Sequence, residues 1–147
     1  MENWMKLEFE AIPENEGFAR VAVAAFITPL NPTMEEISDV KTAVSEAVTN
    51  AVIHAYQEKG GKICIRCSLE GELLHMEVED FGTGIADVER AMEPLFTTRP
   101  DLERSGMGFA FMEAFMDSLE VESKKGEGTT VVMEKKLGCA SFLDCEE

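Results

Sequence analysis

The sequence predicts an α/β (α+β) protein that folds as a two-layer sandwich, with helices on one face of a mostly antiparallel mixed sheet. Alternating apolar and polar residues mark several short strands, and apolar residues at helical spacing mark the helices between them. Turn residues separate these segments, and no long linker divides the chain. At 147 residues the chain has the length of one compact domain. We expect a single domain over residues 1–137, followed by a loose tail over residues 138–147.

The N-terminal segment predicts a strand followed by a helix. Residues 7–11 alternate between apolar and polar, which indicates a short strand that ends at Pro13. Asn15 can cap the following helix, and Pro29 and Pro32 end it. The apolar residues of this helix share one face, which we expect to pack on the core: Phe18, Val21, Ala22, Ala25 and Phe26.

The longest helical pattern lies in the middle of the chain. Thr33 and Glu36 form a capping box at its start, and the pattern continues to about Gln57. Gly60 and Gly61 then end the helix. Its apolar face is broad and contains Ile37, Val40, Val44, Ala47, Val48, Ala51 and Ala55.

The remaining segments alternate between strands and helices. Residues 63–78 predict a hairpin, and its second strand runs into Asp80. We expect a short helix near residues 87–92 and a mobile loop over residues 94–105, which show no clear periodicity. Residues 108–136 then predict a helix, a strand, a turn and a final strand.

Charge and hydropathy exclude two classes of partner. The formal net charge of -16 and the lack of any basic cluster argue against nucleic acid, because phosphate backbones are bound by grouped Lys and Arg. No apolar run approaches the ~20 residues that span a bilayer, so we expect no membrane segment. The N-terminus lacks the pattern of a secretory signal, which predicts a cytoplasmic protein.

Two of the four cysteines, Cys64 and Cys67, form a C-x-x-C motif. Such a motif can bind zinc or exchange a disulfide. Here it lies in a predicted strand, where an offset of three residues points the two side chains to opposite faces. We therefore expect structural cysteines and no metal.

Glu46 and Asn50 lie one turn apart on the long helix, on a face away from its apolar side. Such a pair can form an ordinary solvated polar face. It can also serve chemistry, because an asparagine oxygen suits Mg²⁺ and a glutamate can accept the proton of an attacking hydroxyl. His54 follows on the same helix, and we expect a hydrogen-bonded structural role for it.

Asp80, Gly82 and Gly84 follow directly after a predicted strand. The glycines allow the backbone to turn sharply and approach a flat ligand, while the carboxylate can accept a hydrogen bond from an exocyclic amine. An adenine ring has both features. Turns after strands often contain Asp and Gly, so the motif alone also fits a plain turn.

The third motif covers residues 104–109, RSGMGF, and leads into a predicted helix. Glycines at a helix start expose backbone N–H groups to a phosphate chain, and the helix dipole favours negative charge. Arg104 adds a cation. The alternative is a flexible glycine-rich hinge. The P-loop motif and the kinase HRD and DFG motifs are absent, so a different nucleotide fold is needed.

Together, E-x-x-x-N at 46–50, D-x-G-x-G at 80–84 and G-x-G at 106–108 resemble the N box and glycine boxes of the gyrase, Hsp90, histidine kinase and MutL ATPase superfamily. Over nearly the whole chain the sequence is similar to the family of sporulation anti-sigma F factors. The stretches FARV, NPTMEEI, VSEAVTNAVIHAY, PLFTTRP and ERSGMGF carry this resemblance. It implies a Bergerat-type sandwich that binds ATP with Mg²⁺ and forms ADP as the product.

The resemblance also implies roles for single residues. Glu46 would be the general base, Asn50 the Mg²⁺ ligand, Asp80 the adenine reader and Arg104 the contact to the terminal phosphate. The implied ATP-binding set is Asn50, Asp80, Gly82, Gly84, Thr97, Thr98, Arg104, Ser105, Gly106, Met107, Gly108, Phe109 and Thr130. Within this set, Thr97 and Thr98 match the ATP lid, and Thr130 matches a late glycine-box position.

The implied activity is that of an anti-sigma factor and serine-protein kinase. Such a protein binds its sigma factor and phosphorylates an anti-anti-sigma protein on a serine. The resemblance further implies a homodimer and a partner-binding surface at Arg20.

Three alternatives stay open at this point. The chain could belong to the related stress-response anti-sigma kinases, or it could be a nucleotide-switched binding module that transfers no phosphate. The presence of Glu46 argues against a binding module without phosphoryl transfer, since nucleotide binding alone needs no general base. A histidine-kinase catalytic domain would share the boxes, but this chain has no room for the helical domain that carries the acceptor histidine.

Overall fold

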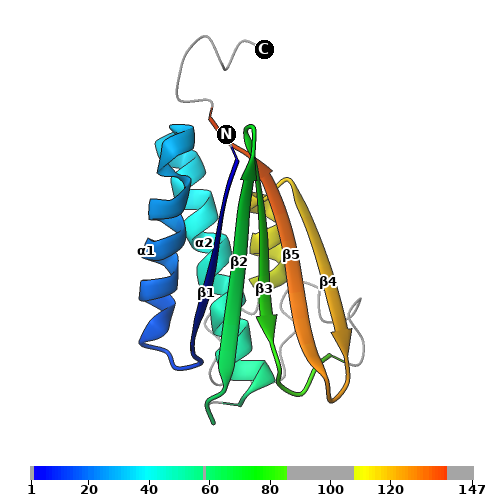
Figure 1. Cartoon of the computed structure of the whole chain (residues 1–147). Helices are drawn as coiled ribbons and strands as arrows, with labels where there is room; N and C mark the ends of the chain where they lie inside the picture. The colour runs from blue at the N-terminus through cyan, green and yellow to red at the C-terminus, as the bar shows by residue number, and fades with distance from the viewer. Residues whose placement is uncertain (1, 58, 86–107, 139–147) are drawn as a thin grey trace.

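A computed structural model describes residues 2–57, 59–85 and 108–138 of the chain. In this part, helices cover one face of a five-stranded sheet and leave the other face open (Figure 1). This is the predicted two-layer α+β sandwich. The expected short helix near residues 87–92 and the loop over residues 94–105 lie outside the described residues. No helix in the described part is both long and apolar enough to span a membrane.

The strands lie in the order β1-β2-β3-β5-β4, and each adjacent pair is antiparallel. Their bounds are Glu2–Glu10 for β1, Lys62–Glu70 for β2, Leu73–Asp80 for β3, Ser118–Lys124 for β4 and Gly128–Lys136 for β5. The expected mixed character is therefore not seen in this sheet. The reason is its topology: β3 and β4 run parallel, but the hairpin returns β5 into the gap between them.

The core lies between the sheet and the helices. Alternate residues of the central strands point into it, including Ile65 of β2 and Met76 of β3, and both are fully buried. Helix α2, Met34–Asn50, supplies the opposing layer through Val40, Val44 and Val48, which are also inaccessible to solvent. Burying one such side chain contributes roughly 1.5–3 kcal/mol, so the central strands and α2 fix the sandwich.

Helix α1, Asn15–Ile27, packs on the core with a different face from the one we predicted. Its buried residues are Ala19, Val23 and Ile27, whereas Phe18 and Val21 are 52% and 61% exposed. Both faces of the helix are apolar in sequence, and its packing against α2 decides which one is covered. The predicted cap is also wrong, because Asn15 lies inside the helix and its amide donates to the carbonyl of Glu10.

Helix α2, Met34–Asn50, begins with the predicted capping box. The Thr33 hydroxyl accepts from the Glu36 N–H at 3.0 Å, and the Glu36 carboxylate accepts from the Thr33 N–H at 2.8 Å. The helix does not continue unchanged to residue 57. It passes into one turn of π-helix, η2, over Ala51–Ala55. Turns of this kind are rare and occur often at functional sites.

Helix α4, Gly108–Phe115, packs on α2, and β4 begins soon after it, at Ser118. Lys135 of β5 holds its C-terminal end. The Lys135 ammonium donates to the carbonyl of Phe115 at 2.7 Å and lies 3.5 Å from the carboxylate of Asp39 on α2. This contact joins the sheet to both helices.

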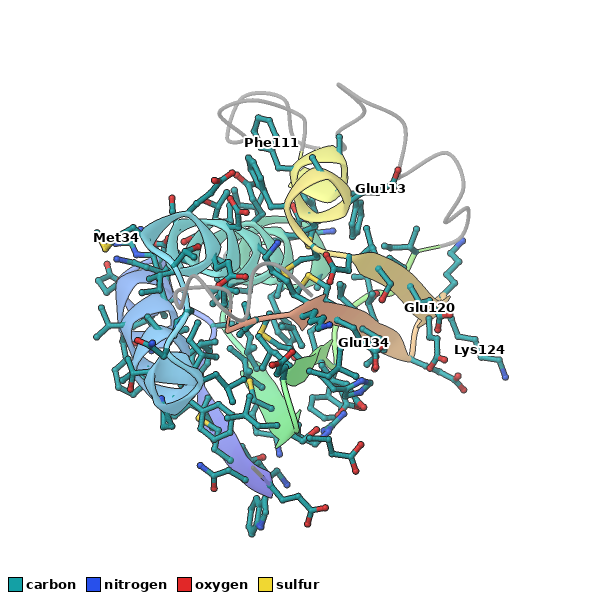
Figure 2. All side chains as sticks on the ribbon, turned by 90° about the horizontal axis from the view of Figure 1, so that it is seen from above. Met34, Phe111, Glu113, Glu120, Lys124 and Glu134 are labelled. Atoms are coloured by element: carbon teal, nitrogen blue, oxygen red, sulfur yellow. The ribbon has the colours of Figure 1, made fainter. Side chains whose placement is uncertain are left out.

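The open face of the sheet is polar and charged. His75 on β3 lies between Glu77, 2.9 Å away, and Glu134 on β5, 2.8 Å away. Figure 2 shows Glu134 on the side of the sheet opposite to α4. Cys64 lies on this face while Cys67 belongs to the core, as predicted for a strand. Burial raises the pKa of Cys67 to about 12, so its thiol stays protonated.

Candidate functional site

The first part of the site is the end of α2. Glu46 and Asn50 are half-buried, one turn apart, while their neighbours Ala47 and Ala51 face the core. The two side chains therefore share a face that is turned away from the sheet side of the helix, as the sequence predicted. Glu46 and Asn50 lie close together because residues four apart in the sequence are neighbours on a helix.

Gly108, the first residue of α4, lies directly against these two side chains. A Cβ atom at Gly108 would lie 3.0 Å from Asn50 Nδ2, 3.1 Å from Asn50 Oδ1 and 3.2 Å from Glu46 Oε2. Such distances are tighter than ordinary van der Waals contact. The third sequence motif thus meets the first at the start of a helix, where backbone N–H groups have no partner within the helix.

Asp80 ends β3 and is only 8% exposed. Its Oδ1 accepts hydrogen bonds from the N–H groups of Gly82, at 3.1 Å, and Thr129, at 3.2 Å. In the part of the chain that the structure describes, its Oδ2 accepts no hydrogen bond. Burial raises the pKa of the carboxyl group, and the two N–H donors oppose this rise. The second oxygen of this largely buried carboxylate can thus accept a hydrogen bond from a ligand.

The backbone of residues 82–84 is packed so closely that two positions need glycine. A Cβ at Gly82 would overlap the carbonyl oxygen of Ala55 at the end of η2. Gly84 has a φ of 72° and lies against the carbonyl of Lys124 at the end of β4. The loop after β3 is therefore held between the helix that carries Asn50 and the β4–β5 hairpin.

Hydrogen bonds fix the same loop from both sides. The Thr83 N–H donates to the carbonyl of Ala55 at 3.0 Å, and the Thr83 carbonyl accepts from the Gly126 N–H at 2.5 Å. The Ser123 hydroxyl accepts from the Ile85 N–H at 2.6 Å. The N box and the D-x-G-x-G loop consequently occupy the same end of the sandwich.

The structure places one residue of the predicted set, Thr130, on the face of the sheet opposite to Asp80. Thr130 lies on the open face, opposite Glu79 in the neighbouring strand, and therefore points away from Asp80. Thr129 is the residue beside Asp80: it is 7% exposed, and its hydroxyl is 2.8 Å from that of Ser123. Sequence reasoning missed Thr129 because only the strand register shows which of the two threonines faces the site.

The other predicted residues fall into two groups. Phe109 follows Gly108 on α4 and packs against the core. Arg20 lies on α1, outside this cluster, and forms an ion pair with Glu16 at 3.2 Å. The remaining members of the set lie outside the described residues: Thr97, Thr98, Arg104, Ser105, Gly106 and Met107.

These residues fit a nucleotide. Asp80 offers an acceptor oxygen, Gly82 and Gly108 let their backbones approach η2 and the N box, and Asn50 offers an amide oxygen of the kind that Mg²⁺ prefers. In the described residues no group of three or more His, Cys, Asp or Glu could hold a metal ion.

Comparison with known proteins places this geometry in a family. The sequence model of the histidine kinase-like ATPase domain matches residues 9–135, which include both described motifs and Gly108. A protein of Clostridium acetobutylicum named anti-sigma F factor is 60% identical over 137 residues, covering 93% of this chain and 96% of its own. The chain belongs to the anti-sigma F factor family. A Clostridium kluyveri member of the family is 56% identical over 95% of this chain and 99% of its own.

A solved structure confirms the fold. The RsbU and RsbW domains of Rv1364c from Mycobacterium tuberculosis align with a TM-score of 0.66 at 20% identity. The alignment covers 92% of this chain and 32% of that longer one. As a member of a family with a histidine kinase-like ATPase domain, the chain binds ATP.

Proposed function

We propose that this chain is an anti-sigma factor and serine-protein kinase. It binds and inhibits a sporulation sigma factor of the F type and phosphorylates the anti-anti-sigma antagonist of that factor on a serine, using ATP and Mg²⁺. The observation that carries this proposal is the approach of Gly108 to Glu46 and Asn50, because it brings a carboxylate and an amide to the start of the helix expected at the phosphates.

On this proposal the described residues divide the nucleotide between two anchors. Asp80 accepts a hydrogen bond from the exocyclic amine of adenine through Oδ2, and Gly82 and Gly84 let the loop after Asp80 pack against the Ala55 and Lys124 carbonyls. Asn50 holds Mg²⁺ through its amide oxygen. When it is bound, the metal would neutralise negative charge on the phosphate oxygens. Thr129, rather than Thr130, lies on the nucleotide side of β5.

Glu46 is the proposed general base. Its carboxylate lies beside Asn50 and Gly108. A serine hydroxyl that enters there can pass its proton to Glu46 while the serine oxygen attacks the terminal phosphate of ATP, and ADP leaves. Phosphoryl transfer needs little more from the protein than positioning and charge stabilisation. We assign charge stabilisation to Arg104. The phosphate cradle is assigned to Ser105, Gly106 and Met107, and the lid to Thr97 and Thr98.

The partners are proposed from the family name and from the surface. Relatives named anti-sigma F factor imply a sigma factor as one partner, and an antagonist of the sigma–anti-sigma contact as the other. We assign Arg20 to the shared docking surface. Binding of the sigma factor and phosphorylation of the antagonist would both take place in the cytoplasm.

We further propose a homodimer that is formed by α1. The exposed stripe of this helix contains Phe18, Val21 and Ala25, and Phe18 is only partly covered, by the ring of Phe9. Helix α1 lies beside β1, one of the two edge strands of the sheet (Figure 1). A second copy offers the same apolar stripe around a two-fold axis, which makes the surface complementary to itself.

The proposal is tested by one reconstitution. The purified chain is mixed with Mg²⁺, labelled ATP, an F-type sigma factor and its anti-anti-sigma antagonist. We expect label on a serine of the antagonist, and we expect the sigma factor to elute with the chain until the antagonist is added. Sigma binding without label would leave a nucleotide-switched binding module, and neither sigma binding nor label would overturn the proposal.

A further inference from the structure

Tyr56, the first residue after η2, joins three segments of the chain. Its hydroxyl accepts a hydrogen bond from the Phe81 N–H at 2.6 Å and donates one to the carbonyl of Lys62 at 2.6 Å. Phe81 lies between Asp80 and Gly82, and Lys62 begins β2. One phenolic hydroxyl therefore ties the end of the N-box helix to the loop that carries the adenine-reading carboxylate.

The position of the Tyr56 ring is fixed by its surroundings. Gly61 lies so close that a Cβ atom there would overlap the ring. Burial raises the pKa of the Tyr56 hydroxyl, so the group keeps its proton at neutral pH and can donate and accept at once. A phenylalanine would fill the same space but would leave the Phe81 N–H and the Lys62 carbonyl without this partner.

A second contact from the same segment reaches the next residues of the loop. The Ala55 carbonyl accepts the Thr83 N–H at 3.0 Å, and Gly82 lies against the same carbonyl. The end of η2 thus holds the loop at Phe81 by a side chain and at Thr83 by the backbone. The backbone contact persists in any variant of Tyr56, so the hydroxyl can be removed without releasing the loop altogether.

We propose that Tyr56 is a positioning residue for base recognition: its hydroxyl holds Phe81 so that Oδ2 of Asp80 faces the exocyclic amine of the nucleotide. The inference rests on the proposed ATP site and extends it to a residue that does not touch the nucleotide. It assigns to Tyr56 the selectivity for adenine, while Glu46 and Asn50 at the phosphate end stay unaffected.

The test compares Tyr56→Phe with the parent protein in equilibrium binding of Mg²⁺-ATP and Mg²⁺-GTP. The variant loses both hydrogen bonds of the hydroxyl, and loss of the one that holds Phe81 predicts roughly 3- to 10-fold weaker ATP binding and a fall of similar size in the ATP-to-GTP affinity ratio. The KM for ATP should rise by the same factor while kcat stays unchanged. Thr28→Val is the matched control, because it also removes one hydroxyl bond to a backbone carbonyl, at 2.8 Å, on the distant α1 end.

The outcomes separate this inference from the proposed function. A Tyr56→Phe protein with the parental ATP-to-GTP ratio, while the parent binds ATP, would overturn the role of Tyr56 alone. A parent that binds no ATP would overturn the proposed function and this inference with it. Hydrogen exchange of the Phe81 amide in the nucleotide-free protein gives an independent reading: we expect faster exchange in Tyr56→Phe, and unchanged exchange would contradict the inference.

Discussion

At the scale of single residues, the site depends on side chains that are missing as much as on those present. Gly108 leaves the space in which Asn50 and Glu46 lie, and Gly82 leaves the space for the Ala55 carbonyl. Asp80 is largely buried, and two backbone N–H groups hold its Oδ1 and leave its second oxygen as an acceptor. Each of these positions is defined by distances of about van der Waals contact, so small changes there should have large effects.

We predict that Gly108→Ala weakens Mg²⁺-ATP binding. The added methyl group meets Asn50 and Glu46 at 3.0–3.2 Å, and such overpacking costs about 1–3 kcal/mol. ATP affinity should therefore fall by roughly 10-fold or more in a binding titration. Gly17→Ala is the control, because a Cβ there comes no closer than 3.7 Å to its neighbour. Equal affinity for both variants would show that Gly108 does not crowd the site.

Local patterns predicted several of these residues, and long-range register determined the others. The capping box at Thr33 and the shared face of Glu46 and Asn50 depend only on helical spacing, so the sequence was sufficient. The choice between Thr129 and Thr130 depends on the pairing of β3 with β5, which sequence spacing does not give. The contact of Gly108 with Asn50 likewise depends on the packing of α4 on α2.

At the scale of elements, the π-turn η2 and the strand pairing connect the two ends of the nucleotide site. The apolar residues Ala51 and Ala55 fit an α-helix as well as a π-helix, so the sequence pattern gave no sign of the change. The face of α1 was also predicted wrongly, because a helix with apolar residues on two sides does not reveal which side meets the core.

The His75 cluster predicts a pH-dependent pairing of β3 and β5. Hydrogen bonds to Glu134 and then Glu77 raise the pKa of His75 above its ordinary value. The folded state therefore holds the proton more tightly, and this stabilisation is fully present below about pH 6.5 and is lost as the pH rises through the raised value. The urea midpoint of the parent protein should exceed that of His75→Gln most at pH 6.

This difference between the parent protein and His75→Gln should shrink steadily toward pH 9. Arg66 pairs with Glu77 and Glu79 on the same face, but it keeps its charge throughout this range and contributes no pH dependence of its own. A difference in urea midpoint that stays constant, or that grows as the pH rises, would contradict the claim that protonated His75 stabilises the folded state.

At the scale of the whole molecule, the two faces of the sandwich differ in character. The open face of the sheet is a network of charged pairs, as at His75 and Arg66, whereas α1 leaves an apolar stripe uncovered. With a net charge of -16, two copies repel each other at long range, so the apolar stripe must supply the attraction in a dimer.

We predict that Val21→Glu makes the protein monomeric. Val21 is 61% exposed in one chain, and a buried carboxylate in its place would cost several kcal/mol at the interface. Sedimentation equilibrium at micromolar concentration should show a dimer for the parent and a monomer for the variant. Ala114→Glu, an equivalent change on the exposed side of α4, should leave the dimer intact. A dimer that survives in Val21→Glu would place the interface elsewhere.

The most direct measurement of the central claim is the single-turnover rate of phosphoryl transfer to the antagonist, at saturating Mg²⁺-ATP, for the parent protein and Glu46→Gln. Glu120→Gln, an exposed glutamate on β4, is the control. We predict that Glu46→Gln loses about 10²- to 10⁴-fold in rate while its ATP affinity stays within roughly twofold of the parent, and that the control keeps both. Transfer by Glu46→Gln at the parental rate would contradict the account.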